Sequence, residues 1–184
     1  MIQGKIWTFS NMLSISRIIL MIPASYYLVT PMQFHREIAI LFILVAVSTD
    51  ALDGYFARKF NEISEFGKII DPLADKIGVG IVVVMLTIFG DIPLWFTLLI
   101  LFRDIVIFFA GIYIKSKTGI ILPSLMSGKA AVSFLTLTLV FAILKYSWMN
   151  ESFEILLWIT IGLLAYSFLE YAHRFFQTLH ENKK

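Results

Sequence analysis

Residues 50–58 read Asp50-Ala-Leu-Asp53-Gly54-Tyr-Phe-Ala57-Arg58, and they interrupt a chain that is otherwise strongly apolar. Eight residues later the chain continues with three positions at steps of four, Gly67, Asp71 and Asp75. An ionised carboxylate placed near hydrocarbon costs on the order of 3 kcal/mol or more. Four aspartates at one level of a membrane protein therefore need compensation, and bound metal is the compensation that we expect.

The composition defines the class of protein. Of the 184 residues, 59% are hydrophobic and 15% are charged, and the mean hydropathy is +0.84. These values lie far outside the range of soluble domains and predict an integral membrane protein. The formal charge of only +2 predicts that the protein has no nucleic-acid partner. Because the chain has no cysteine, disulfides and thiolate metal sites are excluded, and any metal must use oxygen ligands or the three scattered histidines.

Six apolar stretches are long enough for transmembrane helices, which need about 20 residues each. Such runs favour helices because a helix satisfies its backbone polar groups internally. We therefore expect an all-α bundle of six transmembrane helices forming a single membrane-embedded domain over residues 1–184. The expected spans are Leu13–Val29, Ile38–Phe60, Pro72–Phe89, Ile92–Ile114, Ala130–Trp148 and Phe153–Phe176.

The basic residues gather on one side of these spans. That side carries Lys5, Arg58, Lys59, Lys68, Lys115, Lys117, Arg174, Lys183 and Lys184, whereas the turns of the other side carry only Arg36 and Lys145. By the positive-inside rule both termini are cytoplasmic. We thus expect a multi-pass protein of the cell (inner, cytoplasmic) membrane whose aspartate cluster opens to the cytoplasm.

The first half of the acidic segment forms one stripe on a helix, because residues three or four apart share a face. Asp50 and Asp53 are neighbours on that stripe, and Gly54 and Ala57 continue it. The small residues allow a ligand or another helix to approach the backbone. Arg58, at the next position, can offer a fork of donors to phosphate oxygens.

The second half repeats this pattern. Gly67, Asp71 and Asp75 form one stripe, and residues 59–66 return the chain so that the two stripes can face each other. Pro72 fits the first turn of a helix capped by Asp71, or it bends a helix that begins earlier. The sequence leaves both alternatives open.

Four carboxylates without a nearby imidazole or thiolate match the preferences of hard divalent cations, Mg²⁺ first and then Mn²⁺ or Ca²⁺. Two such ions about 4 Å apart can stabilise both the attacking and the leaving oxygen in a displacement at phosphorus. A carboxylate that is not needed for ligation could act as general base. The segment therefore suits phosphoryl-type transfer to a hydroxyl group.

The pattern D-x2-D-G-x2-A-R-x8-G-x3-D-x3-D, which residues 50–75 fill without departure, resembles the signature of the CDP-alcohol phosphotransferase family. Upstream, the stretch Asn11-Met-Leu13-Ser14-Ile-Ser-Arg17 is similar to the family's N-terminal Asn-x-Leu-Ser/Thr-x-x-Arg segment. This resemblance covers about the first 80 residues. Beyond them, only the number of helices and a few polar positions agree.

The resemblance implies a six-helix membrane enzyme, usually a homodimer, that transfers a phosphate-linked group from a CDP-alcohol to an acceptor alcohol and releases CMP. By position, two divalent cations, Mg²⁺ or Mn²⁺, would be held by Asp50, Asp53, Asp71 and Asp75, and Asp75 would be the catalytic base. The CDP site would be lined by Gly54, Ala57, Arg58 and Gly67.

Several polar residues outside the signature interrupt apolar runs. Arg103 and Asp104 lie within the fourth span, where they either neutralise each other or contact substrate. The turn Ser127-Gly128-Lys129 and Lys115 lie at the expected cytoplasmic level. We expect Lys129, with help from Lys115 or Arg103, to hold the phosphate of the acceptor, although positive-inside orientation alone also explains the lysines.

The stretch Asp71-Pro-Leu-Ala-Asp75-Lys76 resembles the family members that transfer the phosphatidyl group of CDP-diacylglycerol to glycerol 3-phosphate, and this is the activity that we expect. One alternative is a CMP-forming cardiolipin synthase, whose acceptor is phosphatidylglycerol; the pair Arg103-Asp104 resembles a feature of that subgroup. Enzymes with inositol-phosphate or serine acceptors are further alternatives. Polyprenyl transferases also use paired aspartates, but they need more spans. A cation channel would not place Arg58 beside its acidic residues.

Overall fold

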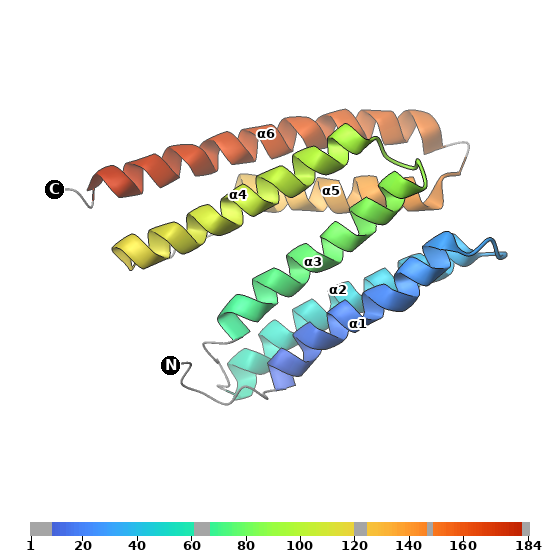
Figure 1. Cartoon of the computed structure of the whole chain (residues 1–184), viewed down its shortest axis with the longest axis horizontal. Coiled ribbons are helices and arrows are strands. Elements are labelled where there is room, and N and C mark those ends of the chain that lie inside the picture. The colour runs from blue at the N-terminus through green and yellow to red at the C-terminus, as the bar shows by residue number, and fades with distance from the viewer. Residues whose placement is uncertain (1–8, 61–66, 120–124, 147–148, 182–184) are drawn as a thin grey trace. The chain divides into compact units, whose positions relative to one another are not determined.

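A computed structural model describes residues 9–60, 67–119, 125–146 and 149–181, excepting the side chains of residues 9–11, 14, 50–60, 67–72, 74 and 75. The described residues form six α-helices: α1 Phe9–Val29, α2 His35–Phe60, α3 Gly67–Ile88, α4 Leu94–Thr118, α5 Met126–Leu144 and α6 Asn150–Glu181 (Figure 1). The all-α prediction is confirmed. Contacts group the chain into two compact units, residues 1–91 and 92–184, and the single domain stays a prediction.

Each of the six predicted spans overlaps one helix, with ends that differ by up to five residues, and α5 begins four residues earlier than expected. Ser127, Gly128 and Lys129, which we predicted to form a turn, lie in its first helical turn. The extended backbone of Leu125 precedes this turn, and the left-handed backbone of Lys145, with a φ of 48°, ends the helix. A small polar residue and a glycine are tolerated there because the first turn has few intrahelical hydrogen bonds to lose.

The helix that carries Asp71 begins at Gly67, before Pro72. The alternative in which Asp71 caps a helix starting at Pro72 is therefore wrong. A helix of this length keeps Gly67, Asp71 and Asp75 on successive turns of one continuous backbone.

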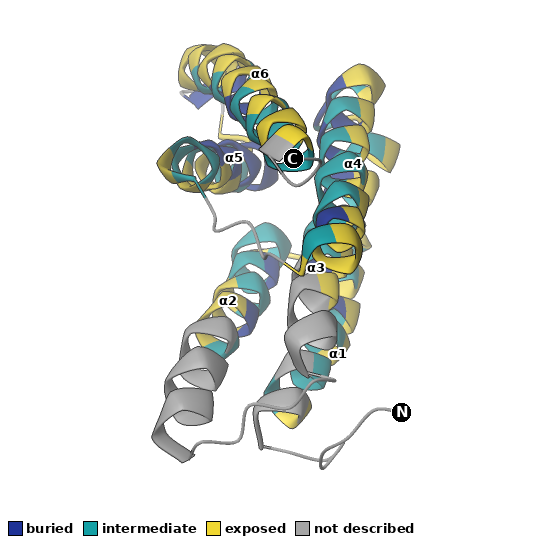
Figure 2. Cartoon of the chain, turned by 90° about the vertical axis from the view of Figure 1, so that its left-hand side faces the viewer, coloured by how far each residue is buried: buried dark blue, intermediate teal, exposed yellow. Residues whose placement is uncertain are grey.

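Three of the described helices are long and apolar enough to cross a membrane, namely α4, α5 and α6. Shorter apolar helices cover Ile15–Val29 in α1 and Lys76–Ile88 in α3. Exposed residues occur along all the helices coloured in Figure 2, and many of them are large and apolar. Such surfaces suit a lipid solvent rather than water. The chain is thus a membrane protein, while the count of six spans and the cytoplasmic termini stay predictions.

In the unit formed by residues 1–91, α1 packs against both α2 and α3. The short connection between α1 and α2 makes them antiparallel, whereas α1 and α3 run in roughly the same direction (Figure 1). The rings of Tyr27 and Phe42 stack with their centres 5.8 Å apart, and Nδ1 of His35 donates to the Tyr27 carbonyl at 2.9 Å. These contacts fix the register between α1 and α2.

A two-pronged ion pair joins the start of α2 to the residues that follow α3. Nη1 and Nη2 of Arg36 lie 3.1 Å from Oδ2 and 3.2 Å from Oδ1 of Asp91. The Asp91 side chain is only 3% exposed and that of Arg36 is 21% exposed. The planar guanidinium matches a carboxylate in this fork geometry, so the pair sets the distance between the two helix ends.

In the unit formed by residues 92–184, α6 packs against both α4 and α5. Near the start of both helices, the ring of Trp95 on α4 contacts that of Trp158 on α6. Near their C-terminal ends, the ring of Tyr113 on α4 contacts that of Phe175 on α6. These two helices are therefore parallel. Between α5 and α6, the buried hydroxyls of Thr138 and Thr160 lie 2.8 Å apart. Because Thr138 donates to the Phe134 carbonyl, Thr160 supplies the proton of this bond.

We predict that Arg36→Gln lowers the free energy of unfolding by about 3 kcal/mol, because it leaves the buried Asp91 carboxylate without its fork partner. The double variant Arg36→Gln/Asp91→Asn should recover much of that loss, since neither charge then remains buried. Thermal unfolding in detergent micelles measures both effects. A double variant as unstable as Arg36→Gln would contradict this account of the pair.

Candidate functional site

The signature positions fall on two helices of the unit formed by residues 1–91. Asp50, Asp53, Gly54, Ala57 and Arg58 belong to α2, and the remaining three, Gly67, Asp71 and Asp75, belong to α3. Their side chains lie outside the described residues. Among the side chains that the structure does describe, no three histidine or acidic residues gather as a metal site.

The helical period relates these positions to the buried faces of the described parts of α2 and α3. On α2 the buried residues include Ala39 and Ala46, and steps of four and seven from Ala46 lead to Asp50 and Asp53. A helix repeats its face at such steps. By helical period, positions 50 and 53 therefore share the helix face of Ala46.

The same rule applies to α3. Gly78 is buried, as are Val82 and Leu86, and steps of three and seven back from Gly78 lead to Asp75 and Asp71. The four aspartate positions of α2 and α3 are thus in helical register with the buried residues of the same helices. Both helices pack against α1, whose own buried face comprises Arg17, Met21, Ala24 and Leu28.

A second polar group lies in the unit formed by residues 92–184, around the guanidinium of Arg103 on α4. Nη1 of Arg103 contacts Oδ1 of Asp104 at 2.7 Å, so the expected neutralising pair is present. Nη2 donates to the Ser167 hydroxyl of α6 at 3.1 Å. The Arg103 side chain is 11% exposed, and none of the described residues accepts a hydrogen bond from its buried Nε.

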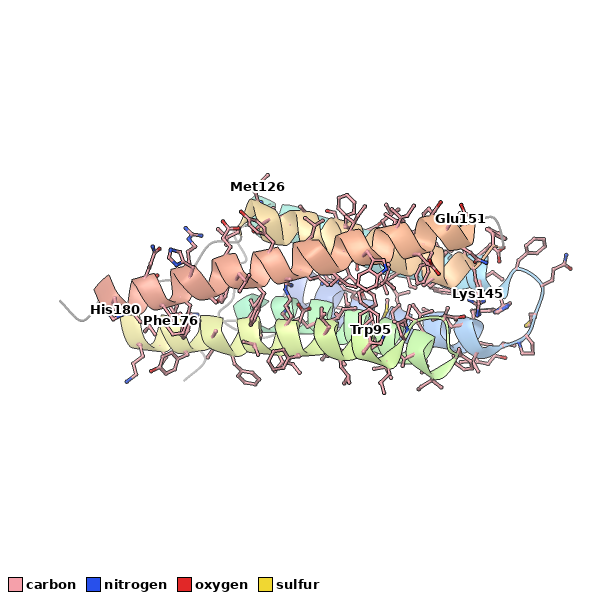
Figure 3. The ribbon with its side chains drawn as sticks, turned by 90° about the horizontal axis from the view of Figure 1, so that it is seen from above. Trp95, Met126, Lys145, Glu151, Phe176 and His180 are labelled. Atoms are coloured by element: carbon pink, nitrogen blue, oxygen red, sulfur yellow. The ribbon has the colours of Figure 1, made fainter. Side chains whose placement is uncertain are left out.

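The start of α5 belongs to the same polar group. The Ser127 hydroxyl donates to the Glu170 carboxylate of α6, and a Cβ added at Gly128 would lie 4.0 Å from Nη2 of Arg103. Lys129, the next residue, is exposed. Figure 3 shows α6 continuing well beyond Met126, the first residue of α5, toward Phe176 and His180. The positive end of the α5 dipole thus lies against the middle of α6.

The three predicted acceptor residues do not all come together. The backbone of Gly128 lies close to Arg103, and Lys129 is the next residue of α5 and is exposed. Lys115 is exposed in the last turn of α4, twelve residues from Arg103, which corresponds to about 18 Å along the helix. Lys115 therefore lies apart from Arg103 along α4, and the role of these three residues in acceptor binding stays a prediction.

Sequence reasoning missed Ser167 and gave no role to Arg17. Ser167 is 2% exposed and Arg17 is 4% exposed. Polar residues inside an apolar run are a usable signal, since such residues normally find partners in the bundle. However, a single sequence does not reveal which partner a residue meets on a helix more than 60 residues away.

Comparison with protein families finds a match to the CDP-alcohol phosphatidyltransferase model over residues 7–166. This chain belongs to the CDP-alcohol phosphatidyltransferase family. The match extends the resemblance from the first 80 residues through α4 and α5 into α6, so it includes Arg103 and the start of α5, whereas Ser167 and Glu170 lie just beyond it. Membership also makes the chain a transferase of phospholipid biosynthesis.

The proteins similar to this chain include two kinds of enzyme of the family. A CDP-diacylglycerol–glycerol-3-phosphate 3-phosphatidyltransferase of Bacillus subtilis is 33% identical over 79% of this chain and 76% of its own length. One of Aquifex aeolicus with the same name is 36% identical over 70% and 71%. Human cardiolipin synthase (CMP-forming) is 41% identical over 61% of this chain, but only 36% of its own length is covered.

We predict that Ser127→Ala lowers the free energy of unfolding by about 2 kcal/mol, the typical value of a hydrogen bond to a charged group. Ser133→Ala is the matched control on the same helix, because among the described residues the exposed Ser133 hydroxyl bonds only to the carbonyl of Lys129 one turn earlier. That control should change stability by less than about 0.5 kcal/mol. Equal effects of the two substitutions on thermal unfolding would remove the α5–α6 link from the account.

Proposed function

We propose that this protein transfers the phosphatidyl group of CDP-diacylglycerol to glycerol 3-phosphate, giving phosphatidylglycerophosphate and CMP. The observation that carries the proposal is the complete acidic signature on α2 and α3. The bacterial relatives named for this reaction support it, because the similarity to them extends over most of both chains.

Four carboxylates suit Mg²⁺ or Mn²⁺, and the proposal assigns two ions to Asp50, Asp53, Asp71 and Asp75. The fit rests on the donor set, which is all oxygen, and on the two buried faces whose helical periods lead to these positions. When bound, such ions would supply positive charge that binds the pyrophosphate and stabilises the oxygens displaced at phosphorus.

The remaining signature residues would bind the donor. Gly54, Ala57 and Gly67 leave the helix backbones open to the nucleotide, and the Arg58 guanidinium pairs with pyrophosphate oxygens. Asp75 takes the proton from the acceptor hydroxyl, whose oxygen then forms a bond to the β-phosphorus. The bond from that phosphorus to the bridging oxygen breaks, and CMP leaves with this oxygen.

The acceptor phosphate is assigned to Arg103 and Lys129. A buried Nε of Arg103 without a described partner offers one hydrogen bond, and the exposed ammonium of Lys129 lies one residue beyond Gly128. The carboxylates of Asp104 and Glu170 are both engaged, with Arg103 and Ser127. The start of α5 adds the positive end of its dipole, which favours an anion.

Cardiolipin synthesis from phosphatidylglycerol is the second candidate, and the relative of that name in human supports it. Inositol-phosphate and serine acceptors remain further alternatives within the family. A lipid acceptor already carries a phosphodiester with one charge, whereas glycerol 3-phosphate carries a doubly charged group. Because Asp104 already matches the charge of Arg103, it is the exposed ammonium of Lys129 that favours the more highly charged acceptor.

The proposal also includes the protein's setting. The excess of Lys and Arg on one side of the spans supports cytoplasmic termini and a site that faces the cytoplasm, in the inner membrane. The family resemblance supports a homodimer. Cysteine accessibility at both ends of the chain and cross-linking in native membranes test these two points.

The test of function offers the purified protein CDP-diacylglycerol together with glycerol 3-phosphate, phosphatidylglycerol, inositol phosphate or serine in separate reactions. We expect CMP release and phosphatidylglycerophosphate only with glycerol 3-phosphate, and loss of both with EDTA. Cardiolipin as the product would replace the proposal with the second candidate, and CMP release undiminished in excess EDTA would contradict the assignment of metal.

We predict that Asp75→Asn lowers kcat for CMP release at least about 100-fold, because the amide keeps the size of the side chain and removes its basicity. Binding of Mn²⁺ to the variant should be measured alongside, so that loss of the base is separated from loss of metal. A kcat near that of the wild type with metal bound would remove Asp75 from the role of base.

We predict that Lys129→Ala raises KM for glycerol 3-phosphate about tenfold, which corresponds to the loss of one charged contact. KM for CDP-diacylglycerol should stay nearly constant. Lys145→Ala is the matched control, because Lys145 is also exposed but follows the opposite end of α5. An equal rise of KM for both substrates would point away from a specific contact with the acceptor.

A further inference from the structure

Arg17 is a buried cation within the apolar stretch Ile15–Val29. It lies in α1 and is 4% exposed, on the same buried face as Met21, Ala24 and Leu28. A charged side chain at such a position is expensive unless it meets an opposite charge or hydrogen-bond acceptors. What lies at its level on the two helices that pack against α1 therefore decides what it does.

The contact between Met21 and Gly78 gives the level of Arg17 on α3. A Cβ added at Gly78 would lie 3.9 Å from Cγ of Met21. Arg17 precedes Met21 by four residues, one turn along α1. Because α1 and α3 run in roughly the same direction (Figure 1), one turn back from Gly78 gives position 74, within the turn between Asp71 and Asp75.

The contact between Tyr27 and Phe42 gives the level of Arg17 on α2. Their stacked rings place these two residues side by side on α1 and α2. These two helices are antiparallel, so ten residues back along α1, to Arg17, correspond to ten residues forward along α2. The count reaches about position 52, within the turn that carries Asp50 and Asp53.

We infer that Arg17 is a positioning residue for the metal centre: its guanidinium holds the carboxylates of α2 and α3 in the orientation that binds divalent cations. This inference rests on the proposed function. Two independent contacts bring the same buried cation level with both acidic turns. Its fork of donors can bond carboxylate oxygens that point away from the ions, and its charge offsets part of the repulsion among four carboxylates.

Orientation and net charge make opposite predictions for removal of Arg17. If Arg17 orients the ligands, its loss weakens metal binding, typically about 10-fold to 100-fold for a residue that supports metal ligands. If Arg17 acts only as a competing positive charge, its loss strengthens metal binding. The direction of the change in Mn²⁺ affinity therefore decides between the two roles.

The experiment titrates Mn²⁺ into the purified full-length protein in lipid nanodiscs, without substrate, and follows the EPR signal of the free ion. Arg17→Gln removes the charge and should weaken Mn²⁺ binding at least about tenfold. Arg17→Lys keeps the charge but not the fork, and it should give a smaller loss. If the Arg17→Gln variant does not fold, the Mn²⁺ affinity of Arg17→Lys alone tests the inference.

Arg36→Gln is the matched control, because it removes the other described arginine of this unit that has a mostly buried side chain, at the far end of α2. It should reduce thermal stability while Mn²⁺ affinity stays unchanged. Unchanged or tighter Mn²⁺ binding by the Arg17 variants overturns the inference. The proposed function fails separately, if the wild-type protein itself binds no Mn²⁺ or releases no CMP.

Discussion

The free-energy cost of charge next to hydrocarbon constrains nearly every polar side chain of this protein. Most of the surface of the described helices suits lipid, so a charge inside the bundle must be matched by another charge, a hydrogen bond or a ligand. Arg36 meets Asp91 in a fork, and Arg103 meets Asp104 and Ser167. The four aspartates of the signature carry more charge that needs compensation, and we propose that divalent metal together with Arg17 provides it.

This constraint also explains how the two units differ. In residues 1–91, the periods of the buried faces of α2 and α3 lead to acidic positions, which suits cations. In residues 92–184, the paired carboxylates and the start of α5 leave a lysine and a buried guanidinium donor available, which suits an anion. The proposed reaction, with a metal-bound donor and a phosphorylated acceptor, would use both kinds of site.

Much of the fold follows from the sequence, because apolar runs of about 20 residues permit few structures in a membrane. All six helices were expected, and the roles of the signature residues, which were assigned from their spacing and from the family resemblance, stay predictions. The start of α5 was not, since Ser127, Gly128 and Lys129 are typical turn residues whose helical conformation depends on partners such as Glu170 of α6. The start of α3 before Pro72 was open for a similar reason, because local preference allows both starts.

Roles that depend on long-range contacts could not be predicted. The role inferred for Arg17 rests on the helix registers, which the contacts of Met21 with Gly78 and of Tyr27 with Phe42 define. Likewise, Ser167 matters only because α6 places it beside Arg103. Helical period predicts which face a residue occupies, but not which residue of another helix lies opposite it.

The central claim is that the acidic turns of α2 and α3 together bind divalent metal. Anomalous scattering from crystals grown with Mn²⁺ tests it most directly, since the signal locates the ion independently of any assumed ligand. We predict anomalous peaks within about 2.3 Å of carboxylate oxygens from both helices, on the side of α1 that carries Arg17. Peaks confined to other parts of the molecule, with none between these two turns, would contradict the account.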